Sequence, residues 1–117
     1  MIVVRKDLKM RRGKECSSAG HASSTWAIRK LLSGNTKLSK EQEDWLSTGT
    51  TKICVQVNSE VELLDIYNKA KAAGLEAHLV TDAGKTEFNG VPTKTCCAIG
   101  PNEASKIDKV TGHLSLY

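Results

Sequence analysis

The spacing of apolar residues changes along the chain, and each spacing predicts a different element. Residues 2–4 are a short β-branched apolar run, which predicts a buried strand. From about residue 14 to residue 32 the pattern becomes helical, and its first half consists mostly of small side chains. The second half carries large apolar residues that we expect to anchor the helix: Trp26, Ile28, Leu31 and Leu32. Gly34 is expected to end it.

Two serines predict the starts of further helices. Ser39 with Gln42 is a capping box that opens a short helix, and Ser59 with Glu62 is a second capping box. Gly74 lies where a C′ glycine belongs, so we expect the helix that starts after Ser59 to end there.

The order of the elements predicts one α/β domain over residues 1–117, built on a layered sheet. Strands are expected at residues 2–4, 53–57, 76–81 and 95–99, with a last helix over residues 102–109. Strands separated by helices favour parallel crossovers. No helix separates the third and fourth strands, so the last strand is expected to be the antiparallel member.

Composition and charge add a weak preference for anionic partners. Hydrophobic residues make up 39% of the chain and charged residues 26%, as in ordinary folded proteins, and the net charge is +4. Six basic residues between Arg5 and Lys14 are opposed only by Asp7. This stretch is either a solvated loop or a patch that contacts phosphates, and charge alone leaves both interpretations open.

The cysteines and the apolar runs indicate a cytoplasmic protein with reduced thiols and no membrane association. No signal-peptide pattern precedes the first strand, and no apolar run approaches the roughly 20 residues that span a bilayer. The four cysteines, which we interpret as small buried hydrophobic residues, are Cys16, Cys54, Cys96 and Cys97. They form no C-x-x-C pair, so we expect no metal site. No P-loop or G-x-G-x-x-G motif supports nucleotide hydrolysis.

Lys14, Ser18 and His21 are spaced by four and three residues, so they share one face near the start of the first long helix. The N–H groups and dipole of a helix N-terminus favour negative charge, and a lysine there adds a second attraction for an anion. The commoner alternative, a solvated lysine and a packed or hydrogen-bonded histidine, stays open.

Asp82 is expected at the C-terminal end of a strand, where ligand crevices of open α/β sheets lie. Its carboxylate could orient a water or accept a proton from it. The alternative is an Asx turn, in which the carboxylate accepts hydrogen bonds from nearby backbone N–H groups. Thr86, Thr93 and Thr95 carry hydroxyls that could bind Asp82, a substrate or water.

Six segments form an ordered set along the chain. They are I-V-V-R-K-D-L-K-M at residues 2–10, Gly13-Lys14, His21-Ala22, Asp82-Ala83-Gly84 with Thr86, A-I-G-P at residues 98–101, and I-D-K-V-T-G-H-L at residues 107–114. In order and approximate spacing the set resembles the peptidyl-tRNA hydrolases of the second, archaeal and eukaryotic, class. The last segment is close to a signature of that class.

The resemblance implies a three-layer α/β/α fold on a four-stranded mixed sheet, often as a homodimer. It implies hydrolysis of the ester between peptide and tRNA in peptidyl-tRNA, which recycles tRNA from aborted translation, without a metal or cofactor. The catalytic candidates that it implies are Lys14, His21, Asp82, Thr86 and Thr95. The candidates for substrate or tRNA binding are Lys9, Arg11, Arg12, Ser18, Lys85 and Lys109.

The hypothesis requires Lys14 to face Asp82 across a shared cleft. Lys14 and the helix N-terminus would stabilise the oxyanion or the 3′ phosphate, and Asp82 would orient or deprotonate a water. Ser18 departs from the family, which usually has a glutamine there, and this raises the alternative of a non-catalytic tRNA- or RNA-binding module on the same fold. A hydrolase for another ester or amide and a structural interaction protein are the remaining alternatives.

Overall fold

The computed structural model describes residues 1–117, and its elements follow the predicted order. The strands are β1 (Ile2–Arg5), β2 (Cys54–Val57), β3 (Ala77–Asp82) and β4 (Thr93–Ile99). The helices are α1 (Arg12–Ser33), α2 (Lys40–Ser47), α3 (Glu60–Ala72) and α4 (Ala104–Thr111). Short 3₁₀ helices cover Lys6–Leu8 and Phe88–Gly90. None of the helices combines the length and apolarity needed to cross a membrane.

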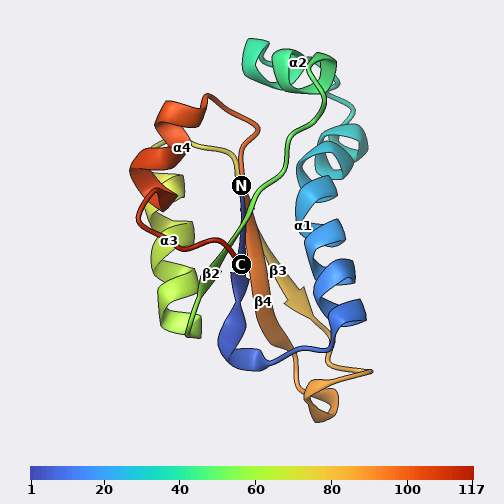
Figure 1. Cartoon of the computed structure of the whole chain (residues 1–117). Coiled ribbons are helices and arrows are strands. Elements are labelled where there is room, and N and C mark those ends of the chain that lie inside the picture. The colour runs from blue at the N-terminus through green and yellow to red at the C-terminus, as the bar shows by residue number, and fades with distance from the viewer.

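The four strands form one mixed sheet in the order β2-β1-β4-β3. β1 and β2 pair in parallel, whereas β4 pairs antiparallel with both β1 and β3. The last strand is therefore the antiparallel member, as predicted. Helix α1 covers one face of the sheet, and α3 and α4 cover the other (Figure 1). This arrangement confirms the predicted three-layer α/β/α fold.

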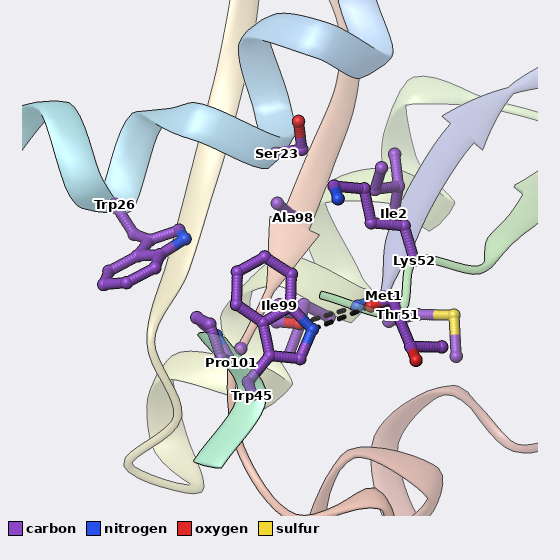
Figure 2. Close-up of a pocket in the computed structure, with 11 residues that line it drawn as sticks. Met1, Ile2, Ser23, Trp26, Trp45, Thr51, Lys52, Ala98, Ile99 and Pro101 are labelled. Atoms are coloured by element: carbon purple, nitrogen blue, oxygen red, sulfur yellow. Dashed lines mark hydrogen bonds between the residues drawn. The ribbon is translucent and has the colours of Figure 1, made fainter. Parts of the chain in front are cut away.

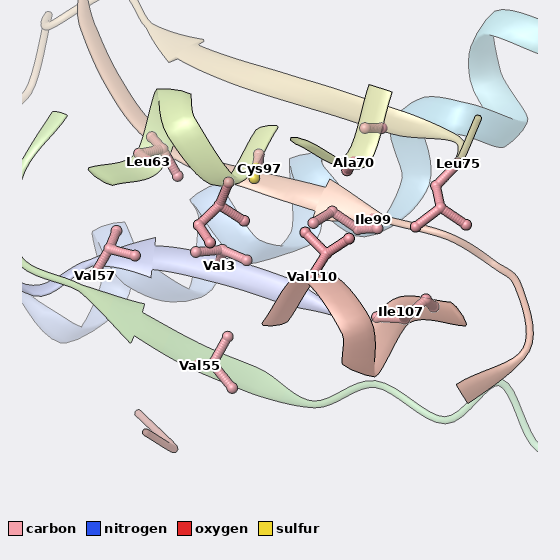
Figure 3. Close-up of a cluster of buried hydrophobic side chains, with 12 residues drawn as sticks. Val3, Val55, Val57, Leu63, Ala70, Leu75, Cys97, Ile99, Ile107 and Val110 are labelled. Atoms are coloured by element: carbon pink, nitrogen blue, oxygen red, sulfur yellow. The ribbon is translucent and has the colours of Figure 1, made fainter. Parts of the chain in front are cut away.

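Each face of the sheet has its own hydrophobic cluster. The larger one, between the sheet and helices α3 and α4, is shown in Figure 3. The smaller one lies under α1. Alternation along the strands sends Val3 and Cys97 to the larger cluster and their neighbours Ile2, Val4 and Cys96 to the smaller. The sheet is thus buried on both faces, which is why β1 and β4 consist almost entirely of apolar or small residues.

The prediction that all four cysteines are buried is wrong for two of them. Cys96 and Cys97 are buried, but Cys16 is exposed and Cys54 is half-buried. Cys16 lies on the outer side of α1, away from the sheet, and Cys54 lies on β2 at the edge of the sheet.

The predicted helix starts are confirmed at Ser39 and only partly at Ser59. Ser39 and Gln42 form the reciprocal capping box. Ser59 accepts a hydrogen bond from the N–H of Glu62, but the Glu62 carboxylate accepts from the N–H of Asn58 rather than from that of Ser59. The return bond of the second box was therefore wrongly predicted, because the chain before Ser59 turns so that a neighbouring N–H is nearer.

The prediction that large apolar residues anchor the second half of α1 holds only for Trp26, which is the last buried residue of this helix. Ile28, Leu31 and Leu32 are 50%, 68% and 82% exposed. Beyond Trp26 the helix continues past the end of the sheet towards α2 (Figure 1), so the sheet offers these side chains no surface to pack against.

Candidate active site

The N-terminus of α1 meets the C-terminal end of β3 at the lower end of the sheet in Figure 1. Lys14, in the first turn of α1, donates a hydrogen bond from Nζ to Oδ1 of Asp82, the last residue of β3, at 2.8 Å. The two side chains are only 13% and 19% exposed. The ammonium and carboxylate that the sequence hypothesis requires to face each other are thus in direct contact.

Both oxygens of the Asp82 carboxylate are engaged. Oδ1 accepts from Lys14, and Oδ2 accepts from the N–H of Gly84 at 2.8 Å, which is an Asx turn. The hydrogen bond from Lys14 lowers the pKa of Asp82 most, partial burial opposes this, and the Gly84 N–H and the charges of Lys14 and His21 lower the pKa further. Asp82 is therefore ionised at neutral pH, and it is a weak proton acceptor that instead holds the lysine in place.

The loop after β3 is closed tightly on itself. Gly84 has a φ of +80°, and a Cβ there would lie 2.4 Å from the carbonyl oxygen of Val91. The N–H of Gly90 donates to the carbonyl of Gly84 at 2.8 Å. Phe88 and Asn89 also have positive φ values of 65° and 51°, which non-glycine residues seldom adopt. The loop is consequently fixed in a shape that presents Thr86 and Glu87 to the start of α1.

Arg11 connects this loop to α1. Its Nε donates to Oε1 of Glu87 at 2.8 Å, and its Nη2 donates to the carbonyl of Thr86 at 3.2 Å. Arg11 is also the N-cap residue of α1, and no side chain caps this helix. The first N–H groups of α1 therefore lack protein acceptors and carry the positive end of the helix dipole.

The end of α1 opens on a depression of ≈ 550 Å³ with no apolar residue in its lining. The residues that line it are Arg11, Gly13, Lys14, Ser17, Thr86 and Glu87. The depression is large enough for a phosphate and an ester group, and the uncapped helix end with its two cations favours an anionic ligand.

The remaining catalytic candidates lie at different depths. His21 is exposed and makes no side-chain hydrogen bond, but it is near enough for its charge to lower the pKa of Asp82. Thr86 is exposed, and its hydroxyl has no partner in the chain. The structure thus gathers Lys14, Asp82 and Thr86 at the N-terminal end of α1, with His21 further along the helix and outside the lining of the depression.

Thr95 is in the protein interior and is not exposed to the depression. The pairing of β3 and β4 shifts between Val80 and Thr81, so that Thr95 is an extra residue in β4. Its side chain is fully buried, with the hydroxyl 3.8 Å from Sγ of Cys96. A substrate in the depression cannot reach Thr95 without a movement of the chain, and its place fits a role in shaping the strand end.

Ser18 is also inside the protein. It lies on the side of α1 that faces the sheet, where its side chain is buried. Its carbonyl accepts a hydrogen bond from the Cys96 thiol at 3.4 Å. The small side chain lies against the sheet, so this structure does not present Ser18 to a ligand at the surface. The helix can approach β4 closely because this position is small.

The basic candidates divide into two groups. Lys9, Arg11, Arg12 and Lys85 are exposed and lie in the segments that lead into α1 or in the loop after β3. Lys109 is exposed on α4, which packs on the opposite face of the sheet (Figure 1). The structure therefore does not bring Lys109 to the same site.

Gly13, Ser17 and Glu87 line the depression but were not predicted as site residues from the sequence. Ser17 is three positions after Lys14, so helical spacing could have indicated it. Glu87 reaches Arg11 across a separation of 76 residues, and no local pattern predicts such a contact.

A further contact joins the C-terminal segment to α1. The Tyr117 hydroxyl donates a hydrogen bond to the Glu15 carboxylate, and this contact raises the pKa of Tyr117 to about 12.

A second pocket lies nearer the C-terminal end of α1, between Trp26, Trp45 and the start of β1 (Figure 2). The indole of Trp45 closes it and donates to the carbonyl of Thr51 at 2.8 Å. Its volume is ≈ 30 Å³, which suits a water molecule but not an aminoacyl ester. The depression at the N-terminus of α1 is therefore the candidate active site. No group of three or more His, Cys, Asp or Glu side chains is arranged to hold a metal ion.

Comparison with known proteins gives a consistent result. Residues 1–117 match the protein family described as "Peptidyl-tRNA hydrolase PTH2". The chain is 44% identical over 116 residues to a "Peptidyl-tRNA hydrolase" of Methanocaldococcus jannaschii, covering 99% of this chain and 96% of that protein. It is 41% identical over 117 residues to a protein of the same name from Aeropyrum pernix, covering 99% and 93%. It is 39% identical over 117 residues to "Peptidyl-tRNA hydrolase 2, mitochondrial" of Bos taurus, covering 100% of this chain and 63% of that protein.

Proposed function

The chain belongs to the peptidyl-tRNA hydrolase PTH2 family, and from this premise we propose that it hydrolyses the ester between peptide and tRNA in peptidyl-tRNA. The reaction recycles tRNA from aborted translation, and we propose that it takes place in the cytoplasm, with residues 1–117 acting as one hydrolase domain. The observation that carries the proposal is the contact between Lys14 and Asp82 at the edge of a polar depression, in a chain that matches the family along its whole length.

Lys14 and the N-terminus of α1 supply the positive charge that ester hydrolysis needs. The barrier lies in forming a tetrahedral oxyanion, and donors fixed in advance lower it. Lys14 is held by Asp82, and the uncapped N–H groups of α1 have no competing acceptor in the chain. We assign to them the stabilisation of the oxyanion or of the adjacent 3′ phosphate.

Asp82 is better suited to hold Lys14 than to take a proton, because its pKa is lowered and both its oxygens are engaged. His21 is the remaining proton acceptor near it, and its side chain is exposed and makes no hydrogen bond. In this proposal His21 accepts a proton from the attacking water and gives it to the leaving 3′ oxygen, and the free hydroxyl of Thr86 orients that water. Thr95 supports the site from below.

The exposed cations around the depression are proposed to bind tRNA. Lys9, Arg11, Arg12 and Lys85 would contact backbone phosphates, which positions the substrate without reading its sequence. Lys109, on the far face of the sheet, would contact only a distant part of a tRNA that wraps around the protein.

A homodimer is proposed through the exposed apolar residues at the C-terminal end of α1 and on α2. Leu31, Leu38 and Leu46 line part of a groove of ≈ 160 Å³, and the exposed Ile28 and Leu32 lie within one helical turn of Leu31 on α1. Contiguous apolar surface of this kind marks interaction sites. A second copy suits it because α1 carries Arg29 and Lys30 at this end and α2 carries Glu41, Glu43 and Asp44, so that the two helices are complementary in charge.

The proposed activity is tested by incubating the chain with N-acetyl-aminoacyl-tRNA and measuring free tRNA, alongside the Asp82→Asn variant. We expect the wild-type chain to release tRNA and Asp82→Asn to be about a hundredfold or more slower, because an amide binds the Lys14 ammonium less strongly than a carboxylate does. Asp65→Asn on α3 is a matched control, since Asp65 also pairs with a lysine, Lys69, but on the other face of the sheet.

A chain that binds tRNA but releases none would instead be the non-catalytic tRNA- or RNA-binding module. Faster cleavage of a small ester than of the tRNA ester would indicate a different hydrolase. Asp82→Asn with the activity of Asp65→Asn would remove Asp82 from the mechanism.

A further inference from the structure

Glu87 carries the only acidic side chain that lines the depression at the N-terminus of α1. Its side chain is 15% exposed, whereas the side chain of its partner Arg11 is 77% exposed. The acid therefore lies in the depression while most of the guanidinium lies in solvent.

In the chain without substrate, both cations of the depression are already paired with carboxylates. Lys14 binds Asp82, and Arg11 binds Glu87, each at 2.8 Å. The depression attracts an anion through these same cations and through the positive end of α1. Arg11 uses Nε for Glu87 and Nη2 for the Thr86 carbonyl, so the edge of the guanidinium that can bind a phosphate through two parallel hydrogen bonds is occupied until Glu87 leaves.

The two pairs differ in how firmly the carboxylate is held. Asp82 is anchored by a second hydrogen bond, from the N–H of Gly84. The Glu87 carboxylate has no partner other than Arg11. An ion pair with one member mostly in solvent contributes little to stability, so the Arg11–Glu87 pair opens more easily than the Lys14–Asp82 pair.

We propose that Glu87 competes with the substrate inside the site: its carboxylate binds Arg11 until a tRNA phosphate displaces it. The inference rests on the proposed function and names the group that regulates access to the same site. Once released, the planar guanidinium can bind a phosphate through two parallel hydrogen bonds. A small anion gains little by displacing Glu87, whereas the 3′ end of tRNA brings several phosphates together. Glu87 thereby favours tRNA over free anions.

Displacement also reaches the loop that holds the site. Arg11 donates to the carbonyl of Thr86 as well as to Glu87. When the guanidinium turns from Glu87 to a phosphate, both residues are therefore released. Thr86 carries the hydroxyl assigned to the attacking water. Binding of a phosphate by Arg11 and adjustment of Thr86 are therefore parts of one event.

The test compares Glu87→Gln with Glu103→Gln. Both remove one negative charge and one ion pair, but Glu103 pairs with Lys106 at the start of α4, on the other face of the sheet. We expect Glu87→Gln to lower KM for N-acetyl-aminoacyl-tRNA about three- to tenfold, with the gain in KM rather than in kcat. A plot of log(kcat/KM) against log salt concentration should be steeper by up to about 0.7 to 0.9 for Glu87→Gln, because no carboxylate then offsets the charge of Arg11 beside the bound phosphate. In an Arg11→Ala background the gain should vanish.

Equal KM values for Glu87→Gln and Glu103→Gln would overturn the proposal. A higher KM for Glu87→Gln with a lower thermal unfolding midpoint would also overturn it and would show that Glu87 only ties the loop to α1. The dissociation constant for deacylated tRNA, measured on the same variants, keeps the test independent of catalysis. If the wild-type chain releases no peptide, the proposed function fails, while tighter binding of deacylated tRNA by Glu87→Gln still supports the competition.

Discussion

The two ends of helix α1 differ in which side chains are buried and which are exposed. At the N-terminal end small side chains such as Ser18 and Ala22 are buried against the sheet, and charged groups at the tip are held by partners from the loop after β3. At the C-terminal end Leu31 and Leu32 stand in solvent without partners. Polar groups are thus enclosed where chemistry is proposed, and apolar groups are open where a second copy is proposed. Burial in this helix follows the extent of the sheet beneath it and not the hydrophobicity of its residues.

The largest effect is expected from a substitution at the polar N-terminal end of α1. Lys14→Ala should lower kcat/KM for N-acetyl-aminoacyl-tRNA about a hundredfold to a thousandfold, because the ammonium that faces the developing oxyanion is lost and Asp82 is left without its cation. Single-turnover and steady-state rates measure it. Lys69→Ala, an exposed lysine on α3, is the control. An unchanged rate in Lys14→Ala would exclude this lysine from the mechanism.

The next largest effect is expected from a substitution at the apolar C-terminal end of α1, which leaves the polar end unchanged. Leu32→Glu should raise the dimer dissociation constant more than about tenfold, because it places a charge in an interface core that must exclude water. Analytical ultracentrifugation over a range of concentrations measures it. Val61→Glu on α3 is a matched control, since Val61 is 77% exposed but lies on the other face of the sheet. A wild-type chain that stays monomeric at every concentration would contradict the proposed interface.

The smallest effect is a pH dependence confined to the polar end. The hydrogen bond from Lys14 lowers the pKa of Asp82 below the model-compound value of 3.8, so the ionised form is favoured by folding. Its contribution to the free energy of unfolding is complete above that value and is lost as the pH falls through the lowered pKa. The difference in free energy of unfolding between wild type and Asp82→Asn should therefore be constant from about pH 7 to about pH 5 and shrink below about pH 4. Urea unfolding at each pH measures it, and a difference that grew on acidification would contradict the ion pair.

The fold could be predicted because its signals are local. Capping at Ser39, glycine at position 74 and alternation at residues 53–57 each act within a few residues, and together they set the order of elements. The antiparallel last strand followed from the missing helix before it. The exposure of Leu31 and Leu32 was missed because helical periodicity shows that residues share a face but not whether anything lies opposite that face.

The site could be predicted in part. Lys14 and Asp82 lie at the ends of a helix and a strand that meet at one edge of the sheet, and the resemblance pointed to both. Thr95 and Ser18 were expected in the site but are buried, because a bulge in β4 and a close approach of α1 are not visible in the sequence pattern. Glu87 was missed because its partner is brought near only by the folded loop.

The exposed Cys16 is a site at which a fluorescent dye could be attached to this protein. It is two residues from Lys14 on the first turns of α1, and burial raises the pKa of the Cys96 and Cys97 thiols to about 11 and about 12. A thiol-reactive dye should therefore attach to Cys16 well before it reaches those two. Its emission would report the arrival of a ligand beside Lys14 in real time, even in variants that complete no turnover.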